Sequence, residues 1–273
     1  MTHPGPAPRM QHRARKRFGQ NFLEDLSVIT RILNAIDVRE TDHLVEIGPG
    51  KGALTESLVQ QSRHLDVIEI DRDLVAYLRS RYAATENLTI HCTDALKTDF
   101  QSLTAGSEKL RVIGNLPYNI STPLLFHLLD QQANIRDMHF MLQKEVVDRI
   151  CANPGSKTFG KLSVMIQFHC KTEALFSVPP HSFIPEPKVT SAVVRLTPRE
   201  SPQYWVKNPG DFRSLVNQAF SKRRKTLRNA LKGFLSAEEI ESTGIDPTAR
   251  AETLEIEDFT RLSDAYSATH VKQ

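Results

Sequence analysis

A glycine-rich turn that follows a short apolar run constrains the fold of this chain more than any other feature. Residues 44–47 are apolar apart from Glu46, and the sequence Gly-Pro-Gly-Lys-Gly follows directly at 48–52. Gly48 allows the close approach of the backbone to a ligand. Helical spacing follows at residues 53–59, so the segment predicts a strand, a turn and a helix of an α/β ligand-binding unit.

The alternation of strand and helix patterns continues along the chain. Further strands are expected at residues 65–70, 88–92, 110–113 and 138–142, with helices at 72–82 and 122–129. Residues 163–168 and 191–196 are β-rich as well, and no helical pattern separates them. We therefore expect a Rossmann-like, mostly parallel, seven-stranded sheet with an antiparallel finish and a ligand at the strand carboxyl ends.

The pattern changes at residues 198–209, where prolines and polar residues replace the periodic spacing. Helical spacing without strand signals follows at residues 212–220, 226–235, 237–242 and 256–266. We expect a flexible basic arm at 1–15, the Rossmann-like domain at 16–199, and a small helical domain for RNA or ribosome binding at 200–273.

Composition excludes several classes of protein. The 273 residues are 40% hydrophobic and 25% charged, which are values of a globular protein. No apolar run has the length of a membrane span and no secretory signal is recognisable, so we expect a cytosolic location. Only three cysteines occur, and they are not clustered, which argues against disulfides, a zinc site and an iron–sulfur cluster. No metal is expected.

Two segments carry basic residues and no acidic residue, at positions 1–23 and 212–237. The net charge of +3 conceals this distribution. Two basic segments indicate a polyanion contacted in two places, while a solvated tail and a solvated helix face remain the alternatives. The bases are Arg9, Arg13, Arg15, Lys16 and Arg17 in the first segment, and Arg213, Lys222, Arg223, Arg224, Lys225, Arg228 and Lys232 in the second.

Acidic residues at successive strand ends distinguish between two kinds of cofactor. The spacing of the glycines also satisfies the dinucleotide fingerprint. Nearby carboxylates repel a pyrophosphate, however, and favour S-adenosylmethionine, which carries a sulfonium and an ammonium. Glu46 precedes the turn, Glu69 has the spacing expected for ribose hydroxyls, and Asp94 can accept from an adenine amino group. Strand-end or capping carboxylates remain the alternative for Glu69 and Asp94.

The tetrapeptide Asn115-Leu116-Pro117-Tyr118 follows the fourth predicted strand. The lone pair of an adenine amino group is delocalised, so the amine needs to be positioned before it can attack a methyl group. The Asn115 side-chain carbonyl and the Leu116 backbone carbonyl could each accept one amino hydrogen, while Tyr118 stacks on the extruded base. The alternative is an ordinary Asn-capped turn.

Five blocks of sequence together resemble the KsgA (RsmA) family of ribosomal RNA adenine dimethyltransferases. They are residues 17–23, 46–50, 115–123, 141–146 and 185–193, and the similarity runs from about residue 10 to the C-terminus. The resemblance implies a class I methyltransferase fold that dimethylates N6 of two adjacent adenosines near the 3′ end of 16S ribosomal RNA. The expected partner is the small ribosomal subunit or its assembly intermediate, with a role in subunit biogenesis, and the protein is expected to be a monomer.

The resemblance also implies roles for individual residues. The cofactor contacts fall on Asn21, Leu23, Gly48, Glu69, Asp94 and Asn115. Phe183 matches an aromatic residue that packs on the target base opposite Tyr118, with an apolar anchor of the proline-rich loop as its alternative. The stretch from Lys222 to Arg228 matches a basic stretch of the family's helical domain. Helical spacing would place Arg224 and Arg228 on one face, with Leu227, Ala230 and Leu231 packed inward. Arg15, Lys16 and Arg17 are expected to contact RNA as well.

Three other functions remain open. A DNA adenine-N6 methyltransferase usually has a second proline where Leu116 stands. An Erm-type enzyme would methylate the large subunit and would differ in the nucleoside that it modifies. A binding-only assembly factor would retain the fold without turnover, which the intact Asn115 and Tyr118 argue against.

Overall fold

The computed structural model describes residues 20–104, 108–117, 120–200, 203–222 and 224–269. The chain forms two compact units, and it passes between them three times. The first unit extends to Lys144 and includes Glu173–Pro198, whereas the second contains Glu145–Thr172 and the chain from Arg199 onward. The last crossing lies close to the expected boundary at residue 199, but residues 145–172 group with the C-terminal helices.

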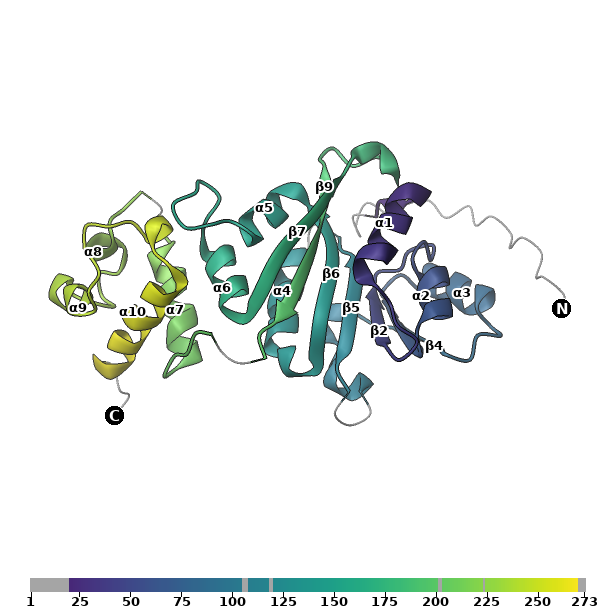
Figure 1. Ribbon diagram of the computed structural model, residues 1–273, viewed down its shortest axis with the longest axis horizontal. Helices are drawn as coiled ribbons and strands as arrows, with labels where there is room; N and C mark the ends of the chain where they lie inside the picture. Colours follow the sequence, from purple (N-terminus) through teal and green to yellow (C-terminus); the bar gives the residue numbers. More distant parts are fainter. Residues whose placement is uncertain (1–19, 105–107, 118–119, 201–202, 223, 270–273) are drawn as a thin grey trace. The chain divides into compact units, whose positions relative to one another are not determined.

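The first unit is built on one seven-stranded sheet (Figure 1), as the sequence predicts. The spatial order is β4-β3-β2-β5-β6-β9-β7, in which the five strands from β4 to β6 are parallel and β9 is antiparallel to β6. The strands are β2 (His43–Ile47), β3 (His64–Glu69), β4 (Leu88–Cys92), β5 (Leu110–Asn115), β6 (Ile135–Gln143), β7 (Cys170–Val178) and β9 (Ser191–Pro198). The strand order reverses between β2 and β5, which is where α/β folds of this kind bind ligands.

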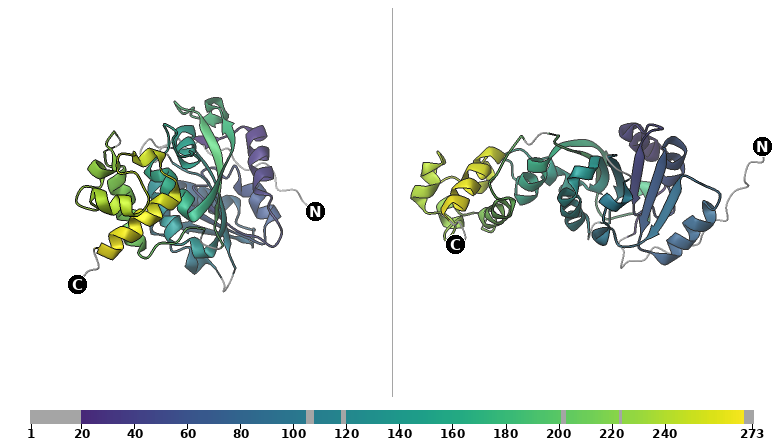
Figure 2. Two further views of the ribbon diagram at one scale, coloured as in Figure 1. Left: turned by 60° about the vertical axis from the view of Figure 1, so that its left-hand side comes forward. Right: turned by 90° about the horizontal axis from the view of Figure 1, so that it is seen from below.

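Helices lie on both faces of this sheet (Figure 2). Three of them were expected and are confirmed as α2 (Thr55–Gln61), α3 (Arg72–Arg81) and α4 (Ser121–Asp130). The sequence analysis missed α1 (Leu26–Ile36), which places Val28, Ile32 and Ile36 in the core. The signal was present, because Asp25 caps the helix by accepting from the amides of Ser27 and Val28. Among the described residues, none of the helices combines the length and apolar character needed to cross a membrane.

The short strand before α1 is part of a two-stranded ribbon. The strand β1 (Phe22–Leu23) pairs antiparallel with β8 (Phe183–Ile184), so that Leu23 is opposite Phe183. The hydroxyl of Ser182 donates to the Asp25 carboxylate at 2.9 Å, and the Glu24 amide donates to the Ser182 carbonyl at 3.0 Å. The ribbon therefore joins the N-terminal segment to the proline-rich loop, which are about 160 residues apart in sequence.

The second unit is helical and is held together by aromatic side chains. Its described helices are α5 (Lys144–Ile150), α6 (Lys161–His169), α7 (Pro209–Ala219), α8 (Leu227–Ala230), α9 (Ala237–Ser242) and α10 (Ile256–Thr269). The rings of Phe168 and Phe212 are 4.3 Å apart, and those of Phe220 and Phe259 are 5.6 Å apart. The first contact explains why α6 groups with the C-terminal helices.

The expected strand at residues 163–168 is wrong, because this segment lies within α6. The Ser163 hydroxyl accepts from the Gly160 amide at 3.0 Å and so caps the helix. Five successive side chains from Leu162 to Ile166 are buried, which removes the 3.6-residue periodicity that marks a helix. The strand β7 begins directly afterwards, at Cys170.

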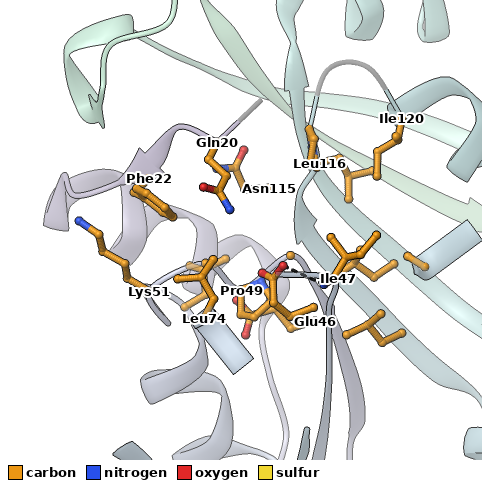
Figure 3. Close-up of a pocket in the computed structure, with 18 of the residues that line it drawn as sticks. Gln20, Phe22, Glu46, Ile47, Pro49, Lys51, Leu74, Asn115, Leu116 and Ile120 are labelled. Atoms are coloured by element: carbon orange, nitrogen blue, oxygen red, sulfur yellow. Dashed lines mark hydrogen bonds between the residues drawn. The ribbon is translucent and has the colours of Figure 1, made fainter. Parts of the chain in front are cut away.

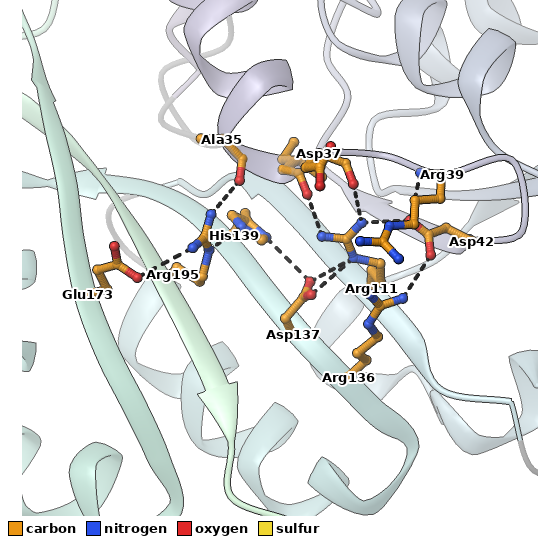
Figure 4. Close-up of polar contacts among 11 residues, drawn as sticks. Ala35, Asp37, Arg39, Asp42, Arg111, Arg136, Asp137, His139, Glu173 and Arg195 are labelled. Atoms are coloured by element: carbon orange, nitrogen blue, oxygen red, sulfur yellow. Dashed lines mark hydrogen bonds and ion pairs between the residues drawn. The ribbon is translucent and has the colours of Figure 1, made fainter.

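A buried ionic network fastens the sheet to the end of α1 (Figure 4). Arg111 on β5 lies between Asp137, to which its Nε donates at 3.0 Å, and Asp42, to which Nη1 donates at 2.6 Å. Its Nη1 also donates to the Asp37 carbonyl at the C-cap of α1. Burial opposes the charge of the guanidinium, but the two carboxylates outweigh burial and raise the Arg111 pKa. Arg136 donates to the other Asp42 oxygen from a half-exposed position.

Candidate active site

A pocket opens at the carboxyl ends of β2, β3, β4 and β5, at the reversal of the strand order (Figure 3). The glycine turn follows β2, Glu69 ends β3, Asp94 follows β4, and Asn115 ends β5. The N-terminal segment 20–23 supplies a further wall, where Gln20 lies beside Asn115. The acids and the amide that are far apart in sequence thus line one cavity, as their strand-end positions predict.

The turn after β2 needs glycine for conformation and for space. Gly48 and Gly50 have φ angles of 67° and 58°, in the left-handed region. A Cβ atom on Gly50 would lie 3.0 Å from the ring of Phe22. The Gly48 amide donates to the carbonyl of Ile68 at 2.9 Å, which ties the turn to the neighbouring strand β3.

Glu69 is buried and held in place by backbone amides. Its Oε1 accepts from the amides of Ile70 at 2.8 Å and Asp71 at 2.9 Å. Burial raises the pKa of Glu69, although these amides and that of Gly50 favour the carboxylate and oppose the rise. The side chain is thereby a fixed acceptor at the end of β3 and lines the pocket.

Glu46 is the second buried carboxyl group of the pocket. Only 2% of the residue is exposed, and the Thr55 hydroxyl donates to Oε2 at 2.6 Å. Burial raises the pKa of Glu46 to about 7, the Thr55 hydrogen bond lowers it, and the neighbouring Glu69 raises it further. A cationic ligand would relieve the cost of ionising this pair, whereas a pyrophosphate would increase it.

Asp94 caps a short 3₁₀ helix of residues Ala95–Lys97 with Oδ1, which accepts from the Leu96 amide at 3.0 Å. No described residue donates to its Oδ2. Asp94 thus serves as a capping carboxylate and retains an acceptor for a ligand. The apolar side chains of Ile70, which is 48% exposed, and Leu96 line the same region.

Asn115 has a defined orientation at the end of β5. Its Nδ2 donates to the backbone carbonyl of Asn21 at 3.1 Å. In the described part of the chain nothing donates to its Oδ1, so this oxygen remains available to a ligand. The Leu116 amide donates to the Met141 carbonyl at 3.1 Å, which fixes the adjoining peptide. Tyr118, the proposed stacking residue, lies outside the described residues.

Close packing below Asn115 fixes the end of β5. A Cβ atom on Gly114 would lie 2.7 Å from the Ile47 carbonyl oxygen and 2.8 Å from a methyl group of Leu116. Only glycine therefore fits between β2 and β5 at this point. Gly114 is a further residue of the site, and a glycine within an apolar strand is the sequence signal that could have identified it.

The N-terminal segment lines the pocket, and its expected contacts with a cofactor stay a prediction. Asn21 and the buried Leu23 line the cavity, and Gln20 Nε2 donates to Asp71 at 3.2 Å. Lys51 Nζ lies 4.7 Å above the Phe22 ring. Gln20 and Phe22 are therefore further lining residues.

Phe183 does not line this pocket. The residue is 1% exposed and packs in the hydrophobic core beside Leu23, Met141, Val178 and Val193. This burial agrees with the alternative of an apolar anchor, and a contact with the target base stays a prediction.

The basic residues of the second unit lie mainly in a turn. Arg224 and Lys225 are exposed in the segment before α8, which spans only Leu227–Ala230. The expected helix at 226–235 is therefore too long. The amides of Leu227 and Arg228 donate to the carbonyls of Ala249 and Pro247, which are distant in sequence, and not to carbonyls of a preceding helical turn. Lys222 and Arg228 are exposed too, and Leu227, Ala230 and Leu231 are buried as expected. Arg15, Lys16, Arg17 and Arg223 lie outside the described residues.

Comparisons with known proteins identify the family of this chain. Residues 11–268 match the family model "Ribosomal RNA adenine dimethylase". A Pseudomonas aeruginosa protein, "Ribosomal RNA small subunit methyltransferase A", is 56% identical over 254 residues, which cover 93% of this chain and 95% of the relative.

Two solved structures share the fold. A dimethyladenosine transferase from Plasmodium falciparum has a TM-score of 0.77 and 26% identity, covering 88% of this chain and 95% of that chain. The 23S rRNA methyltransferase ErmE has a TM-score of 0.72 and 25% identity, covering 90% of this chain and 100% of its own.

Proposed function

Because this chain belongs to the ribosomal RNA adenine dimethylase family, we propose that it dimethylates N6 of two adjacent adenosines near the 3′ end of 16S ribosomal RNA, with S-adenosylmethionine as methyl donor. One observation carries the chemical part of the proposal. The Asn115 amide is anchored through Nδ2, which leaves Oδ1 as an acceptor at the mouth of a pocket lined by buried carboxyl groups.

The choice of the small subunit is supported by the degree of similarity. The relative named for the small subunit is 56% identical, whereas the 23S enzyme that shares the fold is 25% identical. Both similarities cover at least 90% of this chain, so the difference does not arise from a missing part. We propose the small subunit, or an assembly intermediate of it, as the substrate particle.

The carboxylate acceptors and apolar side chains of the pocket suit S-adenosylmethionine. We propose that Glu69 accepts from ribose hydroxyls, that Asp94 accepts from an adenine amino group, and that Ile70 and Leu96 pack on the adenine ring; the position of these residues in the pocket lining supports these roles. The carboxyl groups of Glu46 and Glu69 favour a ligand that carries positive charge. When bound, this cofactor supplies an electrophilic methyl group on its sulfonium.

The residues at the end of β5 act on the acceptor amine. The Asn115 Oδ1 and the Leu116 carbonyl, to which no residue in the described part of the chain donates, can each accept one amino hydrogen. Two such bonds localise the nitrogen lone pair and direct it away from the base plane. No strong base is required, so the contribution of these residues is positioning and electrostatic stabilisation of the developing ammonium.

The exposed bases of the second unit suit a sequence-independent contact with the RNA backbone. Lys222, Arg224, Lys225 and Arg228 are solvent-exposed, and Arg228 lies near enough to Asp246 to interact with it electrostatically. Bases held in a turn can reach successive phosphates without a helical register. We propose that this cluster docks the particle.

A substrate panel tests the proposal. The protein is incubated with methyl-labelled S-adenosylmethionine and, separately, duplex DNA, naked 16S RNA, undermethylated small subunits and large subunits, and the labelled nucleoside is identified. We expect N6,N6-dimethyladenosine on undermethylated small subunits and much less on naked RNA. Label in large-subunit RNA would indicate the Erm-type activity, and label in DNA a DNA methyltransferase. Binding of the small subunit without any label would indicate an assembly factor.

A further inference from the structure

A cluster of histidines surrounds Asp66 toward the amino ends of the parallel strands, whereas the pocket lies at their carboxyl ends. Strand periodicity places His64 and Asp66 of β3 on one face. The register pairs His43 of β2 with His64, and Thr89 of β4 with Asp66, which brings His91 to the same face. Three strands thus deliver three imidazoles to one carboxylate.

The distances suit ligation of a metal by three of these groups. His43 Nε2 lies 2.6 Å and His64 Nε2 3.6 Å from the same oxygen, Oδ2 of Asp66. One ligand atom from each residue lies within 4.8 Å of the other two. Tetrahedral ligands at about 2.0–2.2 Å from an ion are roughly 3.3–3.6 Å apart. A metal would replace the proton between His43 and Asp66, which requires that contact to open by less than about 1 Å.

The surroundings orient these ligands. His91 Nε2 lies 2.6 Å from the second Asp66 oxygen, and Glu108 Oε2 lies 3.7 Å from His43 Nδ1. This Nδ1 is buried and has no hydrogen-bond partner among the described residues, so a small movement of Glu108 would complete the carboxylate–histidine pair that usually supports a metal ligand. The Thr89 hydroxyl lies 3.2 Å from His64 Nε2, so this contact would be lost when the nitrogen binds a metal.

The cluster is accessible although its central groups are buried. His43 and Asp66 are 6% and 4% exposed, whereas the side chains of His64 and His91 are each 31% exposed. Water can therefore reach the cluster through His64 and His91 and could occupy the remaining coordination position of a bound metal ion. Because His43 begins β2 and Ile47 ends it, the cluster lies roughly 13 Å from the glycine turn along the strand. It is separate from the methyl-transfer site.

We propose that His43, His64 and Asp66 form a binding site for a borderline divalent transition metal such as Zn²⁺ or Co²⁺. His91 is a positioning residue for the Asp66 carboxylate. Two imidazoles and one carboxylate with an open position match these ions rather than Mg²⁺ or Ca²⁺, which prefer sets of oxygen ligands. An ion bound here would link β2 to β3 and stabilise the amino ends of these strands.

Co²⁺ and Zn²⁺ binding to the full-length, untagged and chelator-stripped protein tests the proposal. We expect a saturable visible absorption of tetrahedral or five-coordinate Co²⁺ at one equivalent, its displacement by Zn²⁺, and a metal-dependent rise in the melting temperature. His64→Gln should lower the Zn²⁺ affinity at least tenfold and abolish the absorption. His91→Gln should weaken binding about tenfold and retain the spectrum.

His181→Gln is the matched control, because His181 is exposed and lies outside the cluster. This variant should bind as the parent does, and circular dichroism should show that each variant is folded. Asp66→Asn provides a second removal of a ligand. The proposal is overturned if the parent shows no Co²⁺ absorption, or if His64→Gln keeps the spectrum and affinity of the parent. Either result would mean that the cluster is only a hydrogen-bonded network.

Discussion

The protonation of Glu46 couples cofactor binding to pH. Its pKa of about 7, against an ordinary value of 4.5, means that the apo protein holds a proton there in slightly acidic solution. A bound cation near this group favours the carboxylate. We expect binding of S-adenosylmethionine to release about 0.9 proton at pH 6, about 0.5 at pH 7 and about 0.1 at pH 8, if the pKa falls to near its ordinary value.

The magnitude follows from the difference of about 2.5 pKa units. At about 1.36 kcal/mol per unit, ionising the buried group costs about 3 kcal/mol in the apo protein. The folded-state pKa is raised, so this group stabilises the apo fold below pH 4.5 relative to neutral pH, and that contribution is lost as the pH rises through 7. Below pH 7, the affinity for the cofactor should accordingly increase up to about tenfold for each unit by which the pH is raised.

Isothermal titration in two buffers of different ionisation enthalpy measures the released protons. Glu46→Gln keeps the size of the side chain and removes the titration, so the proton release at pH 6 should fall by about 0.9 relative to the parent. Because Glu69 and Glu46 interact, the difference between the two proteins reports the protons released by this pair. In urea unfolding of the apo proteins, the variant should gain stability relative to the parent between pH 5 and 8. Equal proton release in both proteins would show that Glu46 does not lose a proton when the cofactor binds.

Three further perturbations follow from the contacts. Arg111→Met leaves Asp42 and Asp137 buried without their main partner and should cost about 3–5 kcal/mol in urea unfolding; Arg136→Met, which removes a half-exposed partner of Asp42, should cost less than about 1 kcal/mol, and equal costs would contradict the assigned network. Gly48→Val strains a residue with φ of 67° by about 1–3 kcal/mol and should reduce cofactor affinity at least a hundredfold by calorimetry, while unchanged affinity would remove the turn from the pocket. Arg224→Glu combined with Lys225→Glu should leave cofactor affinity unchanged, weaken small-subunit binding and flatten its salt dependence; a parental salt slope would place the RNA elsewhere.

The sheet was predictable because its strands and turns carry local signals. Residues 44–47 form an apolar run ended by glycines, and the carboxyl ends of parallel strands meet at one edge. Prediction failed where burial is uniform, as in α6, whose side chains from Leu162 to Ile166 all lie inside. It also failed at α8, where backbone bonds to residues 247 and 249 replace a longer helix.

The acids and Asn115 of the pocket could be predicted, but their state could not. The raised pKa of Glu46 depends on burial against Thr55 and Glu69, which no spacing reveals. The orientation of the Asn115 amide depends on a bond to Asn21, 94 residues away. The histidine cluster was invisible to an argument from cysteine spacing, because the pairing of three strands assembles it. Such features arise from tertiary packing.

We propose that Asn115 and Leu116 at the end of β5 position an adenine amino group for methylation. The direct test is single-turnover methyl transfer to undermethylated small subunits by the parent and by Asn115→Ala, with the nucleoside identified by mass spectrometry and the affinities for cofactor and subunit measured alongside. We predict that the parent forms N6,N6-dimethyladenosine, and that Asn115→Ala binds the subunit normally but transfers methyl at least about a hundredfold more slowly. Near-normal transfer by Asn115→Ala would show that the Asn115 amide does not position the acceptor amine.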